Sequence, residues 1–203
     1  MLTEKDTIKC ESIFNDDHTH RFLWSRVWDK SKKVACVIML NPAVSTTLLM
    51  DTTTYLVVNN VARLEEYGGV IVVNLYSKLT SKLCTKWFAP EELNDPVNDS
   101  YIRRAAEDSD IVIAAWGKSG ENNQQIAERV EEVLGVLGGL ENKIHYIADC
   151  GGRVGIHPLT PSVRDEWFLV PLREYIALTS GPASAGSQKK EEQTEKVCDP
   201  QKQ

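Results

Sequence analysis

Four apolar runs in this chain each end in polar or glycine-containing residues, and this repeated pattern constrains the fold more than any other feature. The runs have the length of strands, and the residues that follow them are 41–43, 74–76, 116–118 and 149–152. In an open parallel sheet the carboxyl ends of the strands lie along one edge, where ligands bind. The pattern therefore predicts an α/β sheet and also the place of its ligand site.

Segments with helical spacing separate the apolar runs, at 52–66, from about 98, and at 124–137. Alternation of strands and helices predicts a parallel sheet with helices on both faces, and right-handed crossovers limit its topology. We predict a three-layer α/β/α fold with a four-stranded parallel sheet in the order 2-1-3-4.

The segments outside this pattern give three further expectations. Residues 21–28 alternate as a strand does, and with a turn at 29–32 they predict a β-hairpin with the run 33–40. This hairpin strand joins the sheet at an edge or beside the first parallel strand. Residues 164–178 are predicted to be helical with an interruption at Pro171. The domain spans 1–179, and the polar tail 180–203 is predicted to be disordered because it cannot bury enough apolar surface.

The bulk composition excludes several classes of protein. The net charge of -6 and the pI of about 5.3 lack the basic footprint of a nucleic-acid binder, although a local basic patch stays open. No apolar stretch approaches the roughly 20 residues of a membrane span. The five cysteines include no CxxC pair, which is typical of reduced thiols. With a polar N-terminus, these features predict a cytoplasmic protein without a membrane segment.

Several catalytic signatures are absent from the sequence. There is no P-loop, no GxGxxG after the first strand and no GxSxG. The four histidines do not fall at metal-ligand spacing with acidic residues. We therefore expect no metal and no cofactor, so that any reaction is a metal-independent hydrolysis.

The candidate site residues are amides, one histidine and one acid at the strand ends. Asn41, which Pro42 follows, can orient a water or read the edge of a base because its amide both donates and accepts. An Asx-turn is the alternative for Asn41, and Asn74 has the same two interpretations. Asp51 is either a general base or a helix N-cap. His157 either stabilises a developing anion or has a structural role.

Further candidates surround these residues. Trp116, beside Gly117, either stacks on a flat ligand or belongs to the core. Asn98 and Asp99 either contact a ligand or cap their helix. Leu159 follows His157 closely. Five cations lie in strand-end loops where phosphates would approach; they are Lys78, Lys82, Lys86, Lys118 and Arg153.

An ordered set of motifs resembles a bacterial and phage family, domain of unknown function 1643. The set runs from about Arg21 to Leu159. Its members are Arg21 and Trp24, Met39 to Pro42, Asp51 with Thr53, Gly68-Gly69, Asn74-Leu75, Asn98-Asp99, Ala115 to Gly117 with Gly120, and His157 to Leu159. This resemblance implies no particular activity.

A second resemblance, to the uracil-DNA glycosylase superfamily, implies a chemistry. Residues 39–43 look like the superfamily's first motif, with Met39 and Ala43 in place of its glycines, and residues 157–159 look like its His-Pro motif. By this likeness Asn41 positions the attacking water and His157 stabilises the departing base. Asn74 or Trp116 contacts the extruded base, and Leu159 approaches the gap.

Two hypotheses follow from the sequence. The first is an enzyme that acts on a nucleobase, a nucleotide or nucleic acid, with N-glycosidic hydrolysis as its sharpest form. The second is a non-catalytic module that binds a nucleotide, nucleic acid or a partner protein, for example in phage–host interaction. Both use the same strand-end pocket, but only the first needs an activated water.

Overall fold

The computed structural model describes residues 2–3, 5, 7–81, 83, 85 and 88–179. Its elements are β1 (Lys9–Phe14), β2 (Arg21–Val27), β3 (Lys33–Met39), α1 (Thr52–Arg63), β4 (Tyr67–Asn74), α2 (Pro90–Leu93), α3 (Asn98–Glu107), β5 (Ile111–Ala114), α4 (Gln124–Val136), η1 (Glu141–Lys143), β6 (Ile144–Ala148), η2 (Pro161–Val163), β7 (Phe168–Pro171) and α5 (Leu172–Thr179). Lys82, Lys86 and the predicted tail 180–203 lie outside the described residues.

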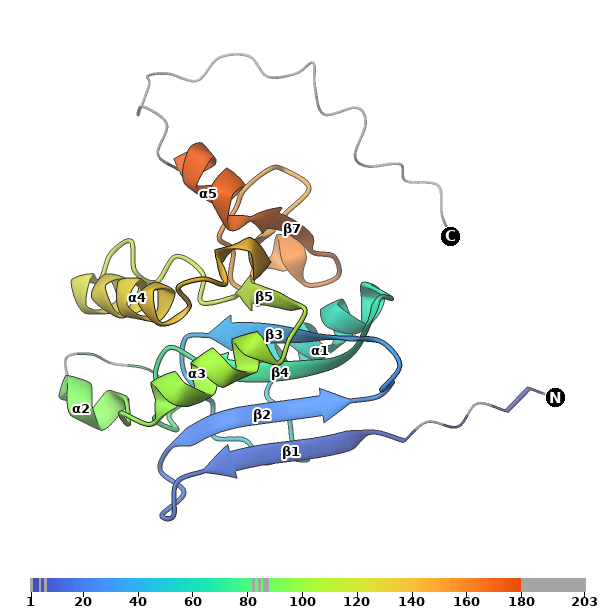
Figure 1. Cartoon of the computed structure of the whole chain (residues 1–203), viewed down its shortest axis with the longest axis horizontal. Helices are drawn as coiled ribbons and strands as arrows, with labels where there is room; N and C mark the ends of the chain where they lie inside the picture. The colour runs from blue at the N-terminus through green and yellow to red at the C-terminus, as the bar shows by residue number, and fades with distance from the viewer. Residues whose placement is uncertain are drawn as a thin grey trace.

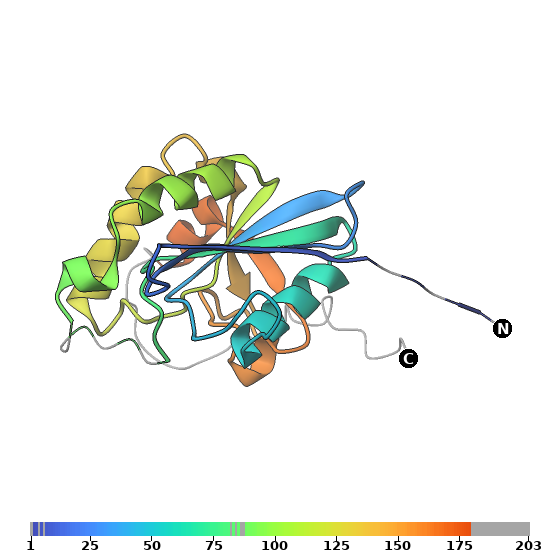
Figure 2. The same ribbon diagram turned by 90° about the horizontal axis from the view of Figure 1, so that it is seen from below.

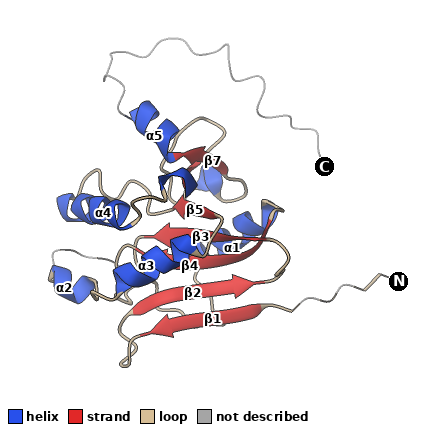
Figure 3. Cartoon of the chain, in the orientation of Figure 1, coloured by secondary structure: helices blue, strands red, loops and turns tan. Residues whose placement is uncertain are grey.

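The molecule is built on one seven-stranded mixed sheet in the order β1-β2-β4-β3-β5-β6-β7 (Figures 1 and 3). In its middle, β4, β3, β5 and β6 run parallel in that order. The outer strands β1, β2 and β7 pair antiparallel. Helix α1 covers one face, and α3 and α4 cover the other (Figure 2). The predicted α/β class is confirmed.

The predicted sheet has too few strands, and the predicted hairpin between residues 21–28 and 33–40 pairs the wrong two strands. Strand β2 pairs with β1 and β4, so β4 lies between β2 and β3. Most of β3 is buried, and a strand buried on both faces belongs between parallel neighbours. The central position of β3 therefore excludes a hairpin with β2, and the hairpin of the structure joins β1 to β2 across residues 15–20.

Two edge strands escaped the sequence analysis. Strand β1 is partly exposed and carries Lys9 and Glu11 between its apolar residues, which weakens its apolar pattern. At the opposite edge, residues 168–171 form β7 where a helix was predicted, and the helix α5 begins only after Pro171. Proline lacks the N–H that a central strand needs, and it is tolerated at an edge.

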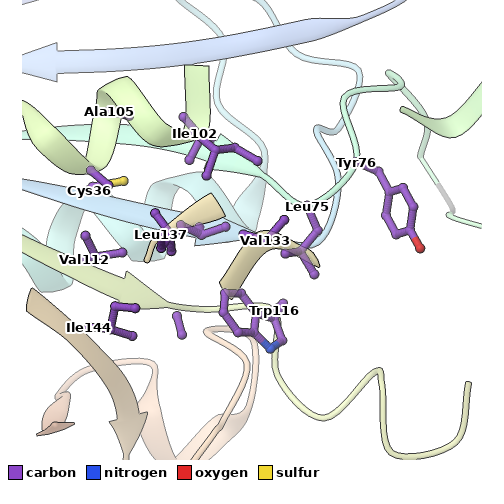
Figure 4. Close-up of a cluster of buried hydrophobic side chains, with 14 of the residues drawn as sticks. Cys36, Leu75, Tyr76, Ile102, Ala105, Val112, Trp116, Val133, Leu137 and Ile144 are labelled. Carbon is purple, nitrogen blue, oxygen red and sulfur yellow. The ribbon is translucent and has the colours of Figure 1, made fainter. Parts of the chain in front are cut away.

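The core has two halves, one on each face of the sheet. Residues of β3, β4 and β5 contribute to both, because successive side chains point to opposite faces. One half packs α3 and α4 on the sheet (Figure 4), and the other packs α1. The parallel strands β4, β3, β5 and β6 all end at the same edge of the sheet. No described helix combines the length and apolar character that crossing a membrane requires.

Candidate functional site

A cavity of about 220 Å³ opens at the carboxyl end of β3. It brings together the three residues proposed from the sequence as catalytic, Asn41, Asp51 and His157, from three separate segments of the chain. The complete lining is Met39, Leu40, Asn41, Ala43, Asp51, Thr53, Thr80, Ser81, His157 and Leu159. The pocket is therefore polar and lies on the side of the sheet edge that α1 covers.

Asn41 presents one end of its amide to this pocket in a fixed orientation. Its Nδ2 donates to the carbonyl of Thr80 at 2.9 Å and to that of Pro42 at 3.3 Å. The Pro42 carbonyl also accepts from the Thr80 backbone at 3.2 Å. None of the hydrogen bonds between described residues uses Oδ1 of Asn41. The side chain therefore offers an acceptor, not the donor–acceptor pair that reading a base edge requires.

Asp51 is the N-cap of α1, as one of its two interpretations predicted. Its Oδ1 accepts from the backbone of Thr53 at 2.9 Å and of Thr54 at 3.1 Å, and its Oδ2 accepts from the Thr54 hydroxyl at 2.7 Å. These bonds satisfy donors at the start of the helix. One acceptor position on Oδ2 is left for a water or ligand in the pocket.

His157 is held as a neutral donor. Its Nδ1 lies 3.2 Å from the backbone nitrogen of Leu159. A backbone N–H only donates, so Nδ1 accepts and the ring proton lies on Nε2. Burial lowers the pKa of His157 below its ordinary value, against the opposing charge of Asp51. Gly117, with a φ of +67°, packs so tightly on this residue that a Cβ there would lie 2.7 Å from the His157 Cβ.

Two buried polar side chains near the pocket lack partners. Arg21 is 1% exposed, and its Nε and Nη2 have no hydrogen-bond partner among the described residues. Burial lowers the pKa of Arg21 to about 10, against the raising effect of Asp51. Asn74 is also 1% exposed, with both side-chain atoms unpartnered. In the sequence, Arg21 stands out only as part of a family resemblance; an arginine that opens an apolar strand was the available signal.

Other candidates belong to the structure around the pocket. Trp116 packs within the core (Figure 4), which is the second of its two interpretations, and its ring lies edge-on to that of Tyr146. Asn98 lies inside α3, and its amide donates to the carbonyl of Asn74 at 3.0 Å. The expectation that Asn98 and Asp99 cap α3 is wrong, because Val97 occupies the cap position without a side-chain bond.

Asp99 binds Arg129, a residue that the sequence analysis treated only as part of a helix. The Arg129 guanidinium donates to both oxygens of Asp99, to Glu132 at 3.0 Å, and through Nε to the Leu75 carbonyl at 2.8 Å. This cluster lies on the α3–α4 side of the sheet. It borders a second cavity of about 320 Å³ that contains none of the proposed catalytic residues.

The described cations of the strand-end loops all have intramolecular partners. Lys78 lies 4.8 Å from the centre of the Phe88 ring, Lys118 pairs with Glu121 at 3.1 Å, and Arg153 pairs with Asp149 at 2.6 Å. None of these three cations lines the pocket. Among the described residues, no group of three or more acidic, histidine or cysteine side chains gathers as a metal site would need.

A family model described as "Protein of unknown function (DUF1643)" matches residues 21–159 of this chain. The chain belongs to the DUF1643 family. Comparisons with curated proteins and with solved structures found no match. The DUF1643 region contains the entire pocket lining as well as Arg21 and Asn74, whereas β1, β7 and α5 lie outside it. The candidate site is thus a feature of the region that defines the family.

Proposed function

We propose that the pocket binds the base of a nucleoside or nucleotide and that the protein hydrolyses its N-glycosidic bond. The observation that carries this proposal is the convergence of Asn41, Asp51 and His157 on one cavity. Pockets for drug-sized ligands have volumes of about 300 Å³ or more. At about 220 Å³, this cavity suits a single ring system. Its lining carries one acid and no lysine or arginine, which favours an uncharged group.

Each of the three residues supplies one part of such a hydrolysis. Oδ1 of Asn41 accepts from a water and orients it toward the anomeric carbon. The water oxygen forms a bond to that carbon while the bond to the base nitrogen breaks, and the electron pair stays with the base. The Nε2–H of His157 donates to the departing base anion. The free position on Oδ2 of Asp51 receives the proton of the water.

The charges around the pocket favour a nucleoside or nucleotide over a nucleic-acid polymer. A protein that binds DNA releases counterions through free lysine and arginine side chains. Here the described cations of the strand-end loops are each engaged by a neighbour, and the chain has a net charge of -6. Salt-dependent DNA binding that disappears on replacing Lys78, Lys82 and Lys86 would contradict this preference.

A non-catalytic binding module is the second candidate, and the state of Asp51 favours it. Three donors already occupy this carboxylate, and capping α1 is sufficient reason for its presence. In this version the pocket uses the same acceptor and donor to hold a base, without activating a water. The two candidates differ only in whether the bound ligand is turned over.

The test combines binding and turnover measurements on the full chain. Calorimetry with a panel of nucleosides and nucleotides identifies the ligand, and chromatography detects the released base. We expect Asn41→Ala and His157→Ala to lower the rate by about 100-fold or more while the dissociation constant changes by less than about 10-fold. Asp51→Asn retains the cap and removes the carboxylate, so it isolates the role of the charge.

Each outcome distinguishes the candidates. Release of a free base that depends on Asn41 and His157 supports the hydrolase. Tight binding without release, weakened by both substitutions, supports the binding module. If no member of the panel binds, both forms of the proposal fail.

A further inference from the structure

The buried guanidinium of Arg21 points to a second ligand site beside the pocket. Arg21 opens β2, at the end of the sheet where the parallel strands terminate, and its backbone N–H donates to Ser77 at 2.9 Å. Only 1% of the residue is exposed. A cation at this depth costs several kcal/mol unless a partner offsets the loss of water. No carboxylate among the described residues forms an ion pair with Arg21.

The orientation of the guanidinium shows which part of it is free. Its Nη1 donates to the Ser45 hydroxyl at 2.9 Å, and that hydroxyl donates in turn to the Ala43 carbonyl at 3.4 Å. The two nitrogens without partners, Nε and Nη2, lie on one edge of the planar group. This edge presents two parallel N–H donors, the arrangement that binds two oxygens of a carboxylate or a phosphate.

The surroundings favour an anion at this edge. Asp51 is the acid that acts on Arg21 electrostatically, but its charge is already offset by the N-terminus of the 12-residue helix α1 and by three hydrogen bonds. Asn74 adds a second unpartnered side chain on the neighbouring strand. It lies opposite Met39, which lines the pocket. Strand alternation places Asn74 on the same face of the sheet as Val70 and Val72, which is the α1 side.

We propose that Arg21 and Asn74 form an oxyanion-binding site behind the wall of the pocket, which takes a carboxylate or phosphate group. Ser45 and Ala43 connect this site to the cavity, because Ala43 lines it and Ser45 holds the guanidinium. The wall belongs to residues 40–51, which form no helix or strand, and three apolar side chains in it face solvent: Val44, Leu48 and Leu49. Movement of this segment admits the anion. The site does not depend on which molecule the pocket itself takes.

The test is the thermal unfolding of the full chain in inorganic phosphate and, separately, in acetate, each balanced with chloride to constant ionic strength. Near 100 times the dissociation constant, we expect a specific anion to raise the Tm by about 5–10 °C. In Arg21→Met the saturable rise disappears, while the Tm without anion stays the same or increases, because a buried cation has been removed. Arg104→Met is the matched control, since Arg104 is exposed and its one ion pair within the described part of the chain is with Asp108.

General salt effects are separated from binding by their dependence on concentration. Phosphate stabilises folded proteins non-specifically, and this part is linear and equal in all variants. Ser45→Ala provides a second arm if Arg21→Met does not fold. This substitution removes the hydrogen-bond partner of Nη1 and is expected to raise the dissociation constant of the anion about 3- to 10-fold. A saturable response to phosphate or to acetate identifies the group that the site takes. If the wild type shows no saturable response to either, or Arg21→Met retains it in full, the proposal is wrong.

Discussion

Two buried arginines at the same edge of the sheet show how differently one residue type can be used. Arg129, on the α3–α4 side, is surrounded by acceptors from Asp99, Glu132 and the Leu75 carbonyl. The guanidinium of Arg21, on the α1 side, has Ser45 as its one hydrogen-bond partner among the described residues. Burial acts in both residues to lower the pKa. Around Arg129 the bonds to Asp99 and Glu132 outweigh burial and raise its pKa, whereas the pKa of Arg21 falls to about 10.

The contrast separates a structural cluster from a candidate binding site. In the Arg129 cluster every strong donor has a partner within the chain, so removal of a member leaves a buried group unsatisfied. On the other side, Arg21 and Asn74 have donors and acceptors that the described chain leaves unused. Unsatisfied buried groups in a folded protein require an explanation, and a ligand is the one that also accounts for the adjacent pocket.

The largest effect is expected from Arg129→Met. This substitution leaves Asp99 without its ion-pair partner and leaves the Leu75 carbonyl with the longer bond from Asn98 at 3.4 Å. Breaking a buried pair costs about 3–5 kcal/mol. Urea unfolding measures the difference in free energy from wild type. Arg21→Met, measured in parallel, is expected to change the free energy of unfolding by no more than about 1 kcal/mol. If both variants lose a similarly large free energy of unfolding, Arg21 is as structural as Arg129 and the distinction between the two arginines is wrong.

A smaller effect is expected from Gly117→Ala, which tests how closely the pocket depends on its supporting loop. A Cβ at Gly117 imposes both a strained φ of +67° and a contact of 2.7 Å with His157. Together these are expected to cost about 2–4 kcal/mol and to weaken ligand binding at the pocket. Gly139→Ala is the matched control, because Gly139 has a φ of +85° but no atom within 4 Å of the added Cβ.

The control substitution is expected to cost about 1 kcal/mol, which is the cost of the backbone strain alone. The difference between the two glycine variants then measures the contact with His157. If both variants lose the same free energy of unfolding and both retain ligand binding, the position of His157 does not depend on Gly117.

The sequence predicted the central strands, and it gave the cap at Asp51 as one of two interpretations, because those features depend on local pattern. Apolar runs mark strands that are buried on both faces, and Asp51 stands directly before a helical period. Strand β1 carries a weak apolar pattern because it lies at the edge of the sheet, and β7 has only four residues, too few for its apolar run to be distinguished from a helix. The pairing of β2 with β4 depends on contacts between distant segments, which no local pattern encodes.

The residues of the site were predictable from the sequence, but whether their polar groups have hydrogen-bond partners was not. Polar residues at the strand ends identified Asn41, Asp51 and His157, which share the pocket. The same reasoning selected Asn98 and Asp99, whose partners lie across the sheet edge at Asn74 and on α4. Whether a buried polar group has a partner is decided by tertiary contacts, so Arg21 and Arg129 are indistinguishable in sequence.

The smallest effect is expected from pH and concerns His157. Burial lowers the pKa of this residue in the folded protein below its ordinary value of 6.5, so the unfolded chain binds the proton more tightly. Stability is therefore fully present above about pH 6.5 and is lost as the pH falls from there to the folded pKa, by at most about 1.4 kcal/mol per pH unit. Urea unfolding between pH 7.5 and 5.5 measures this loss.

His157→Gln is expected to remove this contribution and to flatten the pH dependence. His20→Gln is the matched control, because burial also lowers the pKa of His20, yet His20 lies outside the pocket and bonds to Ser77 at 2.8 Å. A ligand of the pocket should bind more weakly in His20→Gln and in wild type alike as the pH falls through the lowered folded pKa of His157, because protonation of His157 breaks the bond from Leu159 to Nδ1. Ligand binding that is independent of pH in all three proteins would show that the neutral Nε2–H form of His157 does not hold the ligand.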